Sequence, residues 1–268
     1  MERGNTVMST TIEKGSATNI GIVRDHNEDS LICMDLSIAG GVKGSCPGLY
    51  AVADGLGGHE GGEIASDLAL KVLAKSMINS VVLPSLGDNS PVLTAEFISQ
   101  HLAEAVKAAN SEIYLQGIAR GNGMGTTLVA AVLVGDTVCI ANVGDSRVYL
   151  LEDNKFRRVS KDHSLVAEMV EKGKIQPDDI YTHPRRNIVT RCLGTGPAVK
   201  ADLFTEELKP GSSLILCSDG LWEMIRDDQI RDILLAAAGP QDACDRLVEQ
   251  ANKNGGVDNI TVIVLQAK

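Results

Sequence analysis

Four short acidic segments of the 268-residue chain share one design, in which a carboxylate stands at one end of an apolar run, beside Gly or Asn. Asp54 follows Tyr-Ala-Val-Ala, Asp145 follows Cys-Ile-Ala-Asn-Val-Gly, Asp219 follows Leu-Ile-Leu-Cys-Ser, and Asp258 lies just before Ile-Thr-Val-Ile-Val. Any one of these residues could form a turn or cap a helix. Carboxylates that converge on one edge of a sheet, however, repel each other unless a cation neutralises them. The set therefore favours a metal site.

The candidate ligands are oxygen atoms, with no His or Cys at ligand spacing, and oxygen ligands select Mg²⁺ or Mn²⁺ over Zn²⁺. Gly55 after Asp54 lets another backbone approach closely, although Asp-Gly alone is also an ordinary turn. Arg24 lies just before an Asn-Glu-Asp cluster, and its planar guanidinium suits a phosphate. The alternative is that Arg24 pairs with Glu28 or Asp29 in a surface loop. Carboxylates together with an Arg indicate phosphoryl-transfer chemistry.

No nucleotide-binding loop accompanies these residues. The Gly-rich segment 121–125 lacks the Lys of a phosphate-binding loop, and it precedes a strand. Hydrolysis by metal-bound water is therefore favoured over nucleotide-dependent transfer.

The elements that must position these residues follow from apolar periodicity, which predicts an α+β fold of antiparallel strands alternating with pairs of helices. Strands are expected at 17–23, 30–34, 49–53, 126–134, 137–143, 147–151, 156–159, 201–205, 213–217 and 260–265. Helices are expected at 63–77, 98–113, 162–172, 228–237 and 240–251. Short links between 126 and 159 predict one antiparallel meander. Segment 173–199, with three prolines and five basic residues, is expected to be an irregular surface excursion that carries recognition.

Composition narrows the function classes. The net charge is −10, without a basic block, which argues against a nucleic-acid or anionic-membrane surface. Six scattered cysteines without a CxxC pair predict reduced thiols and a cytoplasmic location. The longest apolar stretch, Leu128–Val134, is far too short to span a bilayer. Residues 1–11 lack a signal-peptide core and are expected to form a flexible tail, followed by one catalytic domain over 12–268.

Six ordered motifs make the chain recognisable. They are Gly21-x-x-Arg24-x-x-Asn27-Glu28-Asp29, Val52-Ala-Asp-Gly-Leu-Gly-Gly-His59, Gly123-Met-Gly-Thr-Thr127, Asn142-Val-Gly-Asp-Ser-Arg147, Cys217-Ser-Asp-Gly-Leu221 and Asp258-Asn-Ile-Thr261. Over roughly residues 14–266 they resemble the motif series of the type-2C, metal-dependent Ser/Thr protein phosphatases, in the compact form found in bacteria. The resemblance implies an αββα sandwich, in which two antiparallel β-sheets are flanked by pairs of helices and the site lies in the cleft between the sheets.

The resemblance also implies a set of ligands for two core ions, Mn²⁺ or Mg²⁺, and a weaker third. Asp54 would bridge the two core ions and act in catalysis, with the carbonyl of Gly55 on one of them. Asp219 and Asp258 would hold the other core ion. Asp145, together with Asp219, matches the weaker third-metal site of bacterial members.

Other matched positions concern the substrate. Glu28 would act on metal directly or through a water, with Asp29 behind it, and Arg24 would bind the substrate phosphate in a catalytic role. Segment 173–199 falls where the family has its flap. A Ser/Thr alkoxide is a poor leaving group, yet this chain has Leu56 where many eukaryotic members have a His thought to be the general acid. His59 lies three residues further on and is not assigned that role.

Together these features predict a cytoplasmic, monomeric protein-serine/threonine phosphatase that hydrolyses phosphoserine and phosphothreonine through a bridging metal-bound hydroxide. Its partners would be phosphorylated proteins, the substrates of a Ser/Thr kinase, with no nucleic acid and no membrane. One alternative is a phosphatase of anti-anti-sigma-type regulators. The other is a catalytically silent phosphopeptide-binding domain on the same fold. The substrate, the cognate kinase and a role for Glu223, where some members have Asp, are left open by the sequence.

Overall fold

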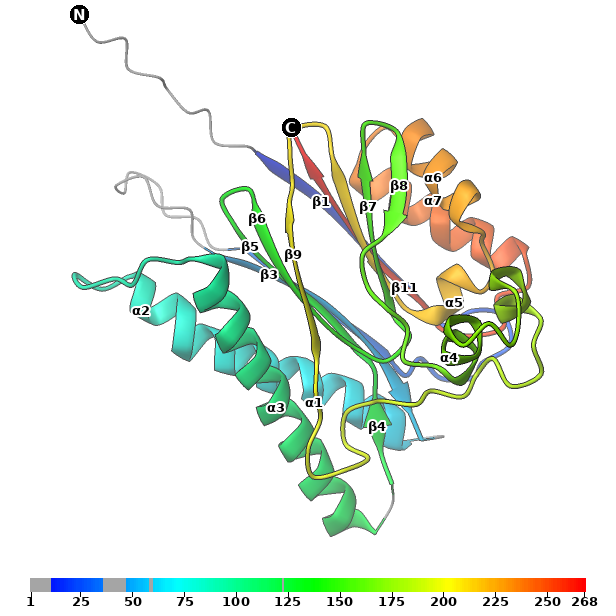
Figure 1. Cartoon of the computed structure of the whole chain (residues 1–268), viewed down its shortest axis with the longest axis horizontal. Coiled ribbons are helices and arrows are strands. Elements are labelled where there is room, and N and C mark those ends of the chain that lie inside the picture. The colour runs from blue at the N-terminus through cyan, green and yellow to red at the C-terminus, as the bar shows by residue number, and fades with distance from the viewer. Residues whose placement is uncertain (1–10, 36–46, 58–59, 122) are drawn as a thin grey trace, which may run out of the picture.

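Two antiparallel sheets packed face to face form the centre of the molecule (Figure 1). The computed structural model describes residues 11–35, 47–57, 60–121 and 123–268. Within these residues the six-stranded sheet has the order β2 (Asp29–Met34), β3 (Gly48–Leu56), β5 (Leu128–Val134), β6 (Thr137–Val143) and β9 (Asp202–Glu207), with β4 (Gly125–Thr126) paired to β3. The five-stranded sheet has the order β1 (Ile12–Asn19), β11 (Ile260–Ala267), β10 (Ser213–Cys217), β7 (Arg147–Glu152) and β8 (Lys155–Arg158).

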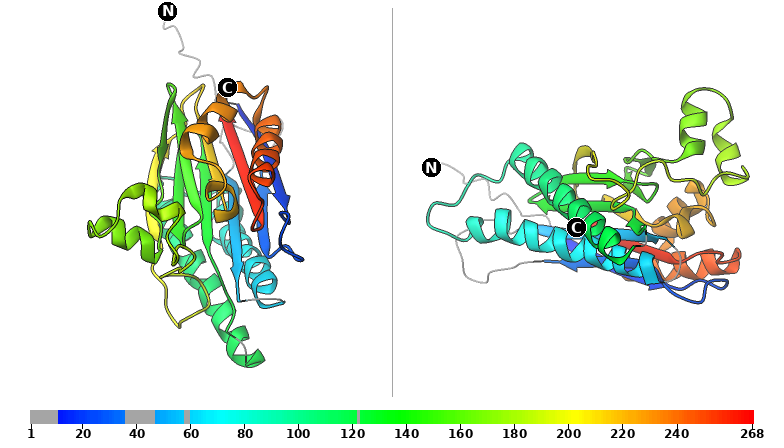
Figure 2. Two further views of the ribbon diagram at one scale, coloured as in Figure 1. Left: turned by 90° about the vertical axis from the view of Figure 1, so that its right-hand side faces the viewer. Right: turned by 90° about the horizontal axis from the view of Figure 1, so that it is seen from below.

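Helices cover the outer face of each sheet, as the views in Figure 2 show. The six-stranded sheet carries α1 (Glu60–Met77), which continues into a π turn (Ile78–Val82) and α2 (Leu83–Ser85), and α3 (Ala95–Arg120). The five-stranded sheet carries α5 (Asp219–Trp222), α6 (Asp227–Ala236) and α7 (Pro240–Lys253). A short α4 (Leu165–Glu171) and a 3₁₀ turn (Pro177–Tyr181) lie before and in the irregular excursion. The predicted αββα sandwich is confirmed.

Three apolar layers hold the sandwich together. Alternate residues of β3 serve two of them, since Ala51 packs toward α1 and α3 whereas Val52 packs between the sheets. A strand buried on both faces reads as a continuous apolar run, which explains why 49–53 lacks alternation. The third layer, between the five-stranded sheet and α5 to α7, contains Ile215, Trp222 and Leu247.

One helical stretch, residues 61–85, is long and apolar enough to cross a membrane by length and composition. Its small and apolar side chains instead pack on β3 and α3, with Ala65, Ala69 and Leu73 fully buried. Exposed Lys71 forms an ion pair with Asp67 on the other face. We therefore assign this stretch to the core of the sandwich.

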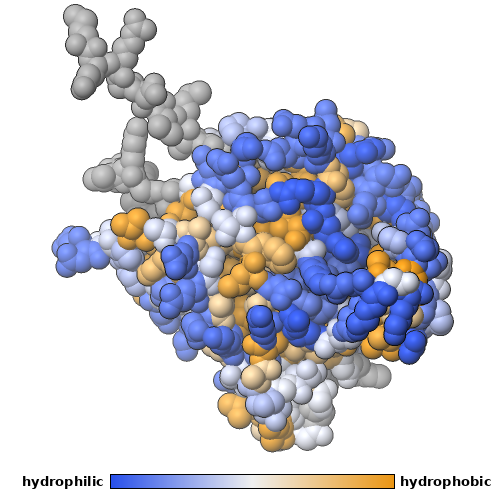
Figure 3. Space-filling view, in the orientation of Figure 1, coloured by the Kyte–Doolittle hydropathy of each residue, from blue (hydrophilic) through white to orange (hydrophobic). Residues whose placement is uncertain are grey.

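The outer surface is mostly hydrophilic on the face shown in Figure 3. Hydrophobic residues gather near the middle of this face, over β9, where the six-stranded sheet ends. Leu203 of β9 is among the exposed apolar side chains. The five cysteines that the structure describes are free thiols, whereas Cys46 lies outside the described residues.

The predicted meander from 126 to 159 is wrong, because β6 and β7 belong to different sheets. The chain leaves the six-stranded sheet at Gly144, whose φ of +111° is unfavourable for any residue with a side chain. A Cβ at this position would also lie 2.6 Å from the Cβ of Thr127. Short links give neighbouring strands only when the chain stays in the plane of one sheet, and here Gly144 turns it into the second sheet.

Two further boundaries differ from the prediction. The first strand covers 12–19 and not 17–23, because its partner is β11 and the chain turns at Gly21, with φ +82°. The helix expected at 162–172 begins only at Leu165, because the Ser164 hydroxyl caps it by accepting from Ala167 N–H. The predicted N-terminal tail falls largely outside the described residues.

Candidate metal centre

Asp54 lies opposite Asp29 in the pairing of β3 with β2. The expectation that the strand ends at Asp54 is wrong, because β3 continues to Leu56 by pairing with β4. This extension fixes the Asp54 backbone: its N–H donates to the Thr127 hydroxyl (3.1 Å), and its carbonyl accepts from Thr127 N–H (2.8 Å) and the Thr126 hydroxyl (2.8 Å). Asp54 is thus held at a rigid place between two strands.

Ser218 connects the two sheets next to Asp54 and its strand partner Asp29. Its hydroxyl donates to Asp29 Oδ2 (2.7 Å) and accepts from Thr261 N–H (3.0 Å). Asp219 follows as the first residue of α5. Asp29 is buried, and its Oδ1 has no hydrogen-bond partner among the described residues.

Arg24 and Asp258 meet at the exposed rim of the centre. The Arg24 Nη2 donates to Asp258 Oδ2 (2.7 Å), and half of the Arg24 side chain is exposed. Asn259 holds the Arg24 loop in place, because its side-chain N–H groups donate to the carbonyls of Ile20 and His26 (2.9 Å each). The Asn259 Oδ1 accepts from the backbone N–H of Glu28 (2.8 Å). One amide side chain therefore positions three parts of the loop.

Asp145 stands at the turn where the chain changes sheets. Its carbonyl accepts from the indole N–H of Trp222 (3.0 Å), and its Oδ1 has no partner in the described part of the chain. Buried Arg147 lies over the Trp222 ring at 3.5 Å from the centroid and binds both oxygens of Asp162. This buried network fixes the turn, and Asp145 with it.

The carboxyl groups of the centre perturb one another. Burial, followed by the neighbouring carboxylates of Asp219, Asp29 and Asp145, raises the pKa of Asp54 well above its ordinary value. Burial and the carboxylates of Asp145 and Asp258 do the same for the pKa of Asp219. The pKa of Asp29 rises to about 6, chiefly through burial, and that of Asp145 rises to about 7 through burial and Asp162. Each of these carboxylates therefore disfavours ionisation of its neighbours.

The donor set fits divalent cations that prefer oxygen. Several carboxylates of the centre are buried, and the Oδ1 atoms of Asp29 and Asp145 lack any hydrogen-bond donor within the described residues. No three Asp, Glu, His or Cys side chains within that part of the chain are close enough to enclose one ion. Asp29 accepts a hydrogen bond from Ser218, and Asp258 accepts one from Arg24.

Glycine is required at two of the predicted motifs. A Cβ at Gly55 would lie 2.3 Å from the carbonyl oxygen of Gly62, and one at Gly220 would lie 2.1 Å from that of Asn259. Gly62 also leaves room for the Glu28 carboxylate, whose Oε2 is 2.7 Å from the position of a Cβ there. A side chain at any of these glycines would therefore push apart the segments that carry the predicted motifs.

The irregular excursion is anchored next to the centre. Arg186 donates to the largely buried Glu223 (Nε to Oε2, 3.3 Å), and the Arg226 guanidinium lies 3.3 Å from the centroid of the Tyr181 ring. Burial raises the pKa of Glu223, and Arg186 opposes that effect. Glu223 therefore holds the excursion, whereas His59 lies outside the described residues.

Three positioning residues escaped the sequence reasoning, namely Ser218, Trp222 and Asn259. Each stands within a quoted motif or directly after one, so their positions were available. Their partners were not, because Ser218 reaches Asp29 across 189 positions of the chain and Asn259 reaches Ile20 across 239. Such contacts come from the pairing of the sheets and leave no local pattern.

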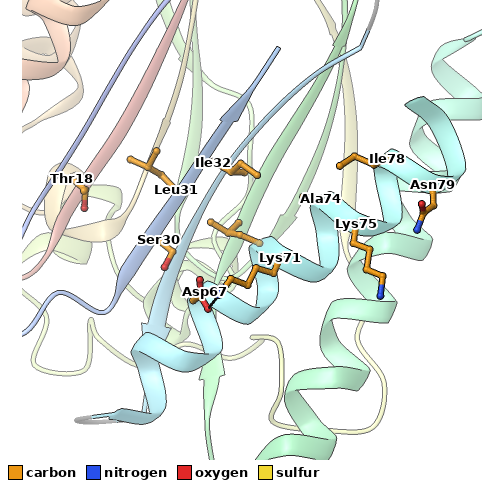
Figure 4. Close-up of a pocket in the computed structure, with 11 residues that line it drawn as sticks. Thr18, Ser30, Leu31, Ile32, Asp67, Lys71, Ala74, Lys75, Ile78 and Asn79 are labelled. Carbon is orange, nitrogen blue, oxygen red and sulfur yellow. Dashed lines mark hydrogen bonds and ion pairs between the residues drawn. The ribbon is translucent and has the colours of Figure 1, made fainter. Parts of the chain in front are cut away.

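A groove of about 670 Å³ lies elsewhere, between α1 and the edge strands β1 and β2 (Figure 4). Leu31, Ile32 and Ala74 line it, with Lys71 and Lys75 at its rim. None of the predicted ligands lines this groove, and its size alone does not make it the reactive site. The carboxylate centre has the chemistry that the groove lacks.

Comparisons with known proteins point to one family. The model of the family described as protein phosphatase 2C matches residues 24–255. The Serine/threonine phosphatase stp of Listeria monocytogenes is 39% identical over 254 residues, covering 93% of each chain. The Serine/threonine protein phosphatase PstP of Mycobacterium tuberculosis is 36% identical over 246 residues, covering 91% of this chain and 43% of its own length.

Solved structures similar to this chain are also described as serine/threonine phosphatases. The serine/threonine phosphatase of S. agalactiae superposes with a TM-score of 0.82 at 30% identity, covering 96% of this chain and all of that one. The catalytic domain of PstP in complex with two manganese ions superposes with a TM-score of 0.78 at 32% identity, covering 96% and 99%.

Proposed function

Because the chain belongs to the protein phosphatase 2C family, we propose that it is a metal-dependent phosphatase that hydrolyses phosphoserine and phosphothreonine in proteins. The observation that supports this proposal is the convergence of buried carboxylates, Asp54 and Asp219 among them, next to a half-exposed Arg24. A relative with this fold is described in complex with two manganese ions. We expect Mn²⁺ or Mg²⁺ in the same role here.

We assign the metal ligands from the motifs that this chain shares with the family. Asp54 would contact both core ions, with the carbonyl of Gly55 beside it, while Asp219 and Asp258 would hold the second ion. Asp145 would complete a weaker third site with Asp219, and Glu28 would act directly or through a water. When bound, such ions offset charge on the phosphoryl oxygens and lower the pKa of the attacking water.

The chain itself orients the substrate. Arg24 lies at the rim, where its guanidinium can receive a phosphate from solvent while Asp258 and the Asn259 clamp keep its loop in place. Asp29, tied to Ser218, supports the inner side of the centre. The Leu56 side chain cannot donate a proton to the departing alkoxide, and we propose that water does so.

The proposal extends to the setting in which the protein acts. A cytoplasmic monomer with one catalytic domain over 12–268 fits the free thiols and the net charge of −10. Its partners would be proteins phosphorylated by a Ser/Thr kinase. A catalytically silent binding domain is disfavoured because Asp54, Asp219 and Asp258 are all present. Anti-anti-sigma-type regulators would be substrates within the same reaction class.

The test is phosphate release from phosphoserine, phosphothreonine and phosphotyrosine peptides with Mn²⁺, with excess EDTA, and with Asp219→Ala. We expect turnover of the first two peptides in Mn²⁺, near-complete loss in EDTA, and near-complete loss in the variant. Asp88→Asn, in an exposed loop, serves as the control and should keep full activity. Undiminished hydrolysis in EDTA after dialysis would exclude the metal-dependent mechanism.

A further inference from the structure

Exposed apolar side chains flank the proposed phosphate-binding residue. Ile22 and Val23, directly before Arg24, are 66% and 64% exposed, and Val257, directly before Asp258, is 39% exposed. Exposing large apolar side chains to water is unfavourable, and a cluster of them next to a functional site marks a contact surface. This cluster adjoins the Arg24–Asp258 pair.

Backbone hydrogen bonds join the two loops that carry the cluster. Ile22 N–H donates to the carbonyl of Gly256 (2.7 Å), and Val23 N–H approaches the same oxygen at 3.3 Å. Gly21 lies against the same turn so closely that a Cβ there would come within 2.7 Å of the Gly256 carbonyl oxygen. Ile22 packs on Gly256, since its Cγ1 is 3.0 Å from the position of a Cβ there. The two loops therefore present their apolar side chains as one surface, which we call the apolar shelf (Ile22, Val23 and Val257).

We propose that the apolar shelf binds an apolar side chain of the substrate, adjacent in sequence to the phosphorylated residue. The inference rests on the proposed function, because the shelf matters only when Arg24 holds the phosphate. The occupant follows from what surrounds the shelf. A substrate with an acidic neighbour would bring its charge toward Asp258, directly after Val257, whereas an apolar neighbour removes apolar area from water without such repulsion.

The expected effect is about tenfold in kcat/KM, the change expected when part of one aliphatic side chain is removed from water on each partner. The test compares two phosphothreonine peptides that are identical except for Leu or Ser next to the phosphothreonine, with p-nitrophenyl phosphate as a substrate that has no neighbour. The full chain is used with Mn²⁺. The exchange of Leu for Ser is made in one peptide pair directly before the phosphothreonine and in a second pair directly after it.

The variant is Ile22→Ser with Val23→Ser, and the matched control is Leu115→Ser with Ile118→Ser on α3, where both residues are 61% exposed. Wild type and control should prefer the Leu peptide about tenfold at one position, whereas the shelf variant should fall to within about twofold. Hydrolysis of p-nitrophenyl phosphate should be equal in all three. If the double variant fails to fold, Val257→Ser provides the same comparison.

Three results would overturn the proposal. The wild type could show no preference at either position, or the preference could persist in the shelf variants. A third result is a wild-type dimer that becomes monomeric in the shelf variant with peptide preference unchanged, which would assign the shelf to a second copy of the chain. Absence of wild-type activity on every substrate would instead refute the proposed function, and the shelf proposal with it.

Discussion

Replacing Asp145 by Asn should make the metal-free protein more stable at neutral and alkaline pH. Asp145 is buried, its Oδ1 lacks a donor in the described part of the chain, and its pKa is raised from 3.8 to about 7, mainly by burial and Asp162. A carboxyl group whose pKa is higher in the folded state stabilises the fold below the unfolded pKa. That contribution disappears as the pH rises through the folded pKa.

The size of the effect follows from the pH interval. Each pH unit between the two pKa values changes the free energy of unfolding by about 1.4 kcal/mol. About two such units lie between pH 5 and the folded pKa of about 7, so raising the pH from 5 to 8 removes about 3 kcal/mol. The amide of the Asp145→Asn variant does not titrate, so its contribution to stability should not change with pH. Asp29, whose pKa rises to about 6, also lowers the stability over this range, but it does so in both proteins.

The assay is urea unfolding in excess EDTA at pH 5, 6, 7 and 8, for wild type, Asp145→Asn and the exposed-loop control Asp88→Asn. The difference in unfolding free energy between Asp145→Asn and wild type should grow by about 3 kcal/mol in favour of the variant as the pH rises. The unfolding free energy of Asp88→Asn should change with pH in the same way as that of wild type. The reasoning would be refuted if the unfolding free energies of Asp145→Asn and wild type changed equally with pH. It would also be refuted if wild type became more stable than the variant as the pH rises.

Three other changes probe the remaining parts of the centre. Ser218→Ala should lower the unfolding free energy by about 1–3 kcal/mol in urea titrations, because it removes the hydroxyl that donates to the buried Asp29 carboxylate. An unchanged urea midpoint would show that this hydrogen bond contributes nothing to stability. Arg186→Ala should lower kcat/KM on phosphopeptides more than on an aryl phosphate, because it frees the excursion from Glu223, and equal losses would indicate damage to the metal site instead. Leu56→His should speed phosphopeptide hydrolysis by at most about tenfold, and aryl phosphate hydrolysis less, because an aryl leaving group needs less help from a proton donor. This expectation would be contradicted if the pH profile of wild-type kcat/KM already showed the titration of a proton donor and a His59 substitution removed it.

Local patterns predicted most of the elements. The helices α3 and α7 were visible because their apolar residues recur at three and four positions, and the strands 213–217 and 260–265 because they are short apolar runs between turn residues. The carboxylates of the centre could be found for a similar reason. Each interrupts or borders an apolar strand, and several such charges in one chain are more than turns and helix caps require.

What the sequence could not supply were the contacts between distant segments. The change of sheet at Gly144 depends on its φ of +111°, and a Gly-Asp-Ser link is equally compatible with a hairpin. Arg24 forms an ion pair with Asp258, 234 positions away, a contact that local reasoning about the neighbouring acids could not supply. The Asn259 clamp and the Trp222 bond to Asp145 arise in the same way, from sheet pairing.

The assignment of Asp54 to two ions can be tested by counting Mn²⁺ bound per chain by equilibrium dialysis, in wild type and in Asp54→Asn. Wild type should bind two ions tightly and a third more weakly. Asp54→Asn should lose tight binding of both core ions, because the same carboxylate is proposed to contact both, while far-UV circular dichroism shows that the fold is kept. Two tightly bound ions in Asp54→Asn, as in wild type, would contradict the proposed centre.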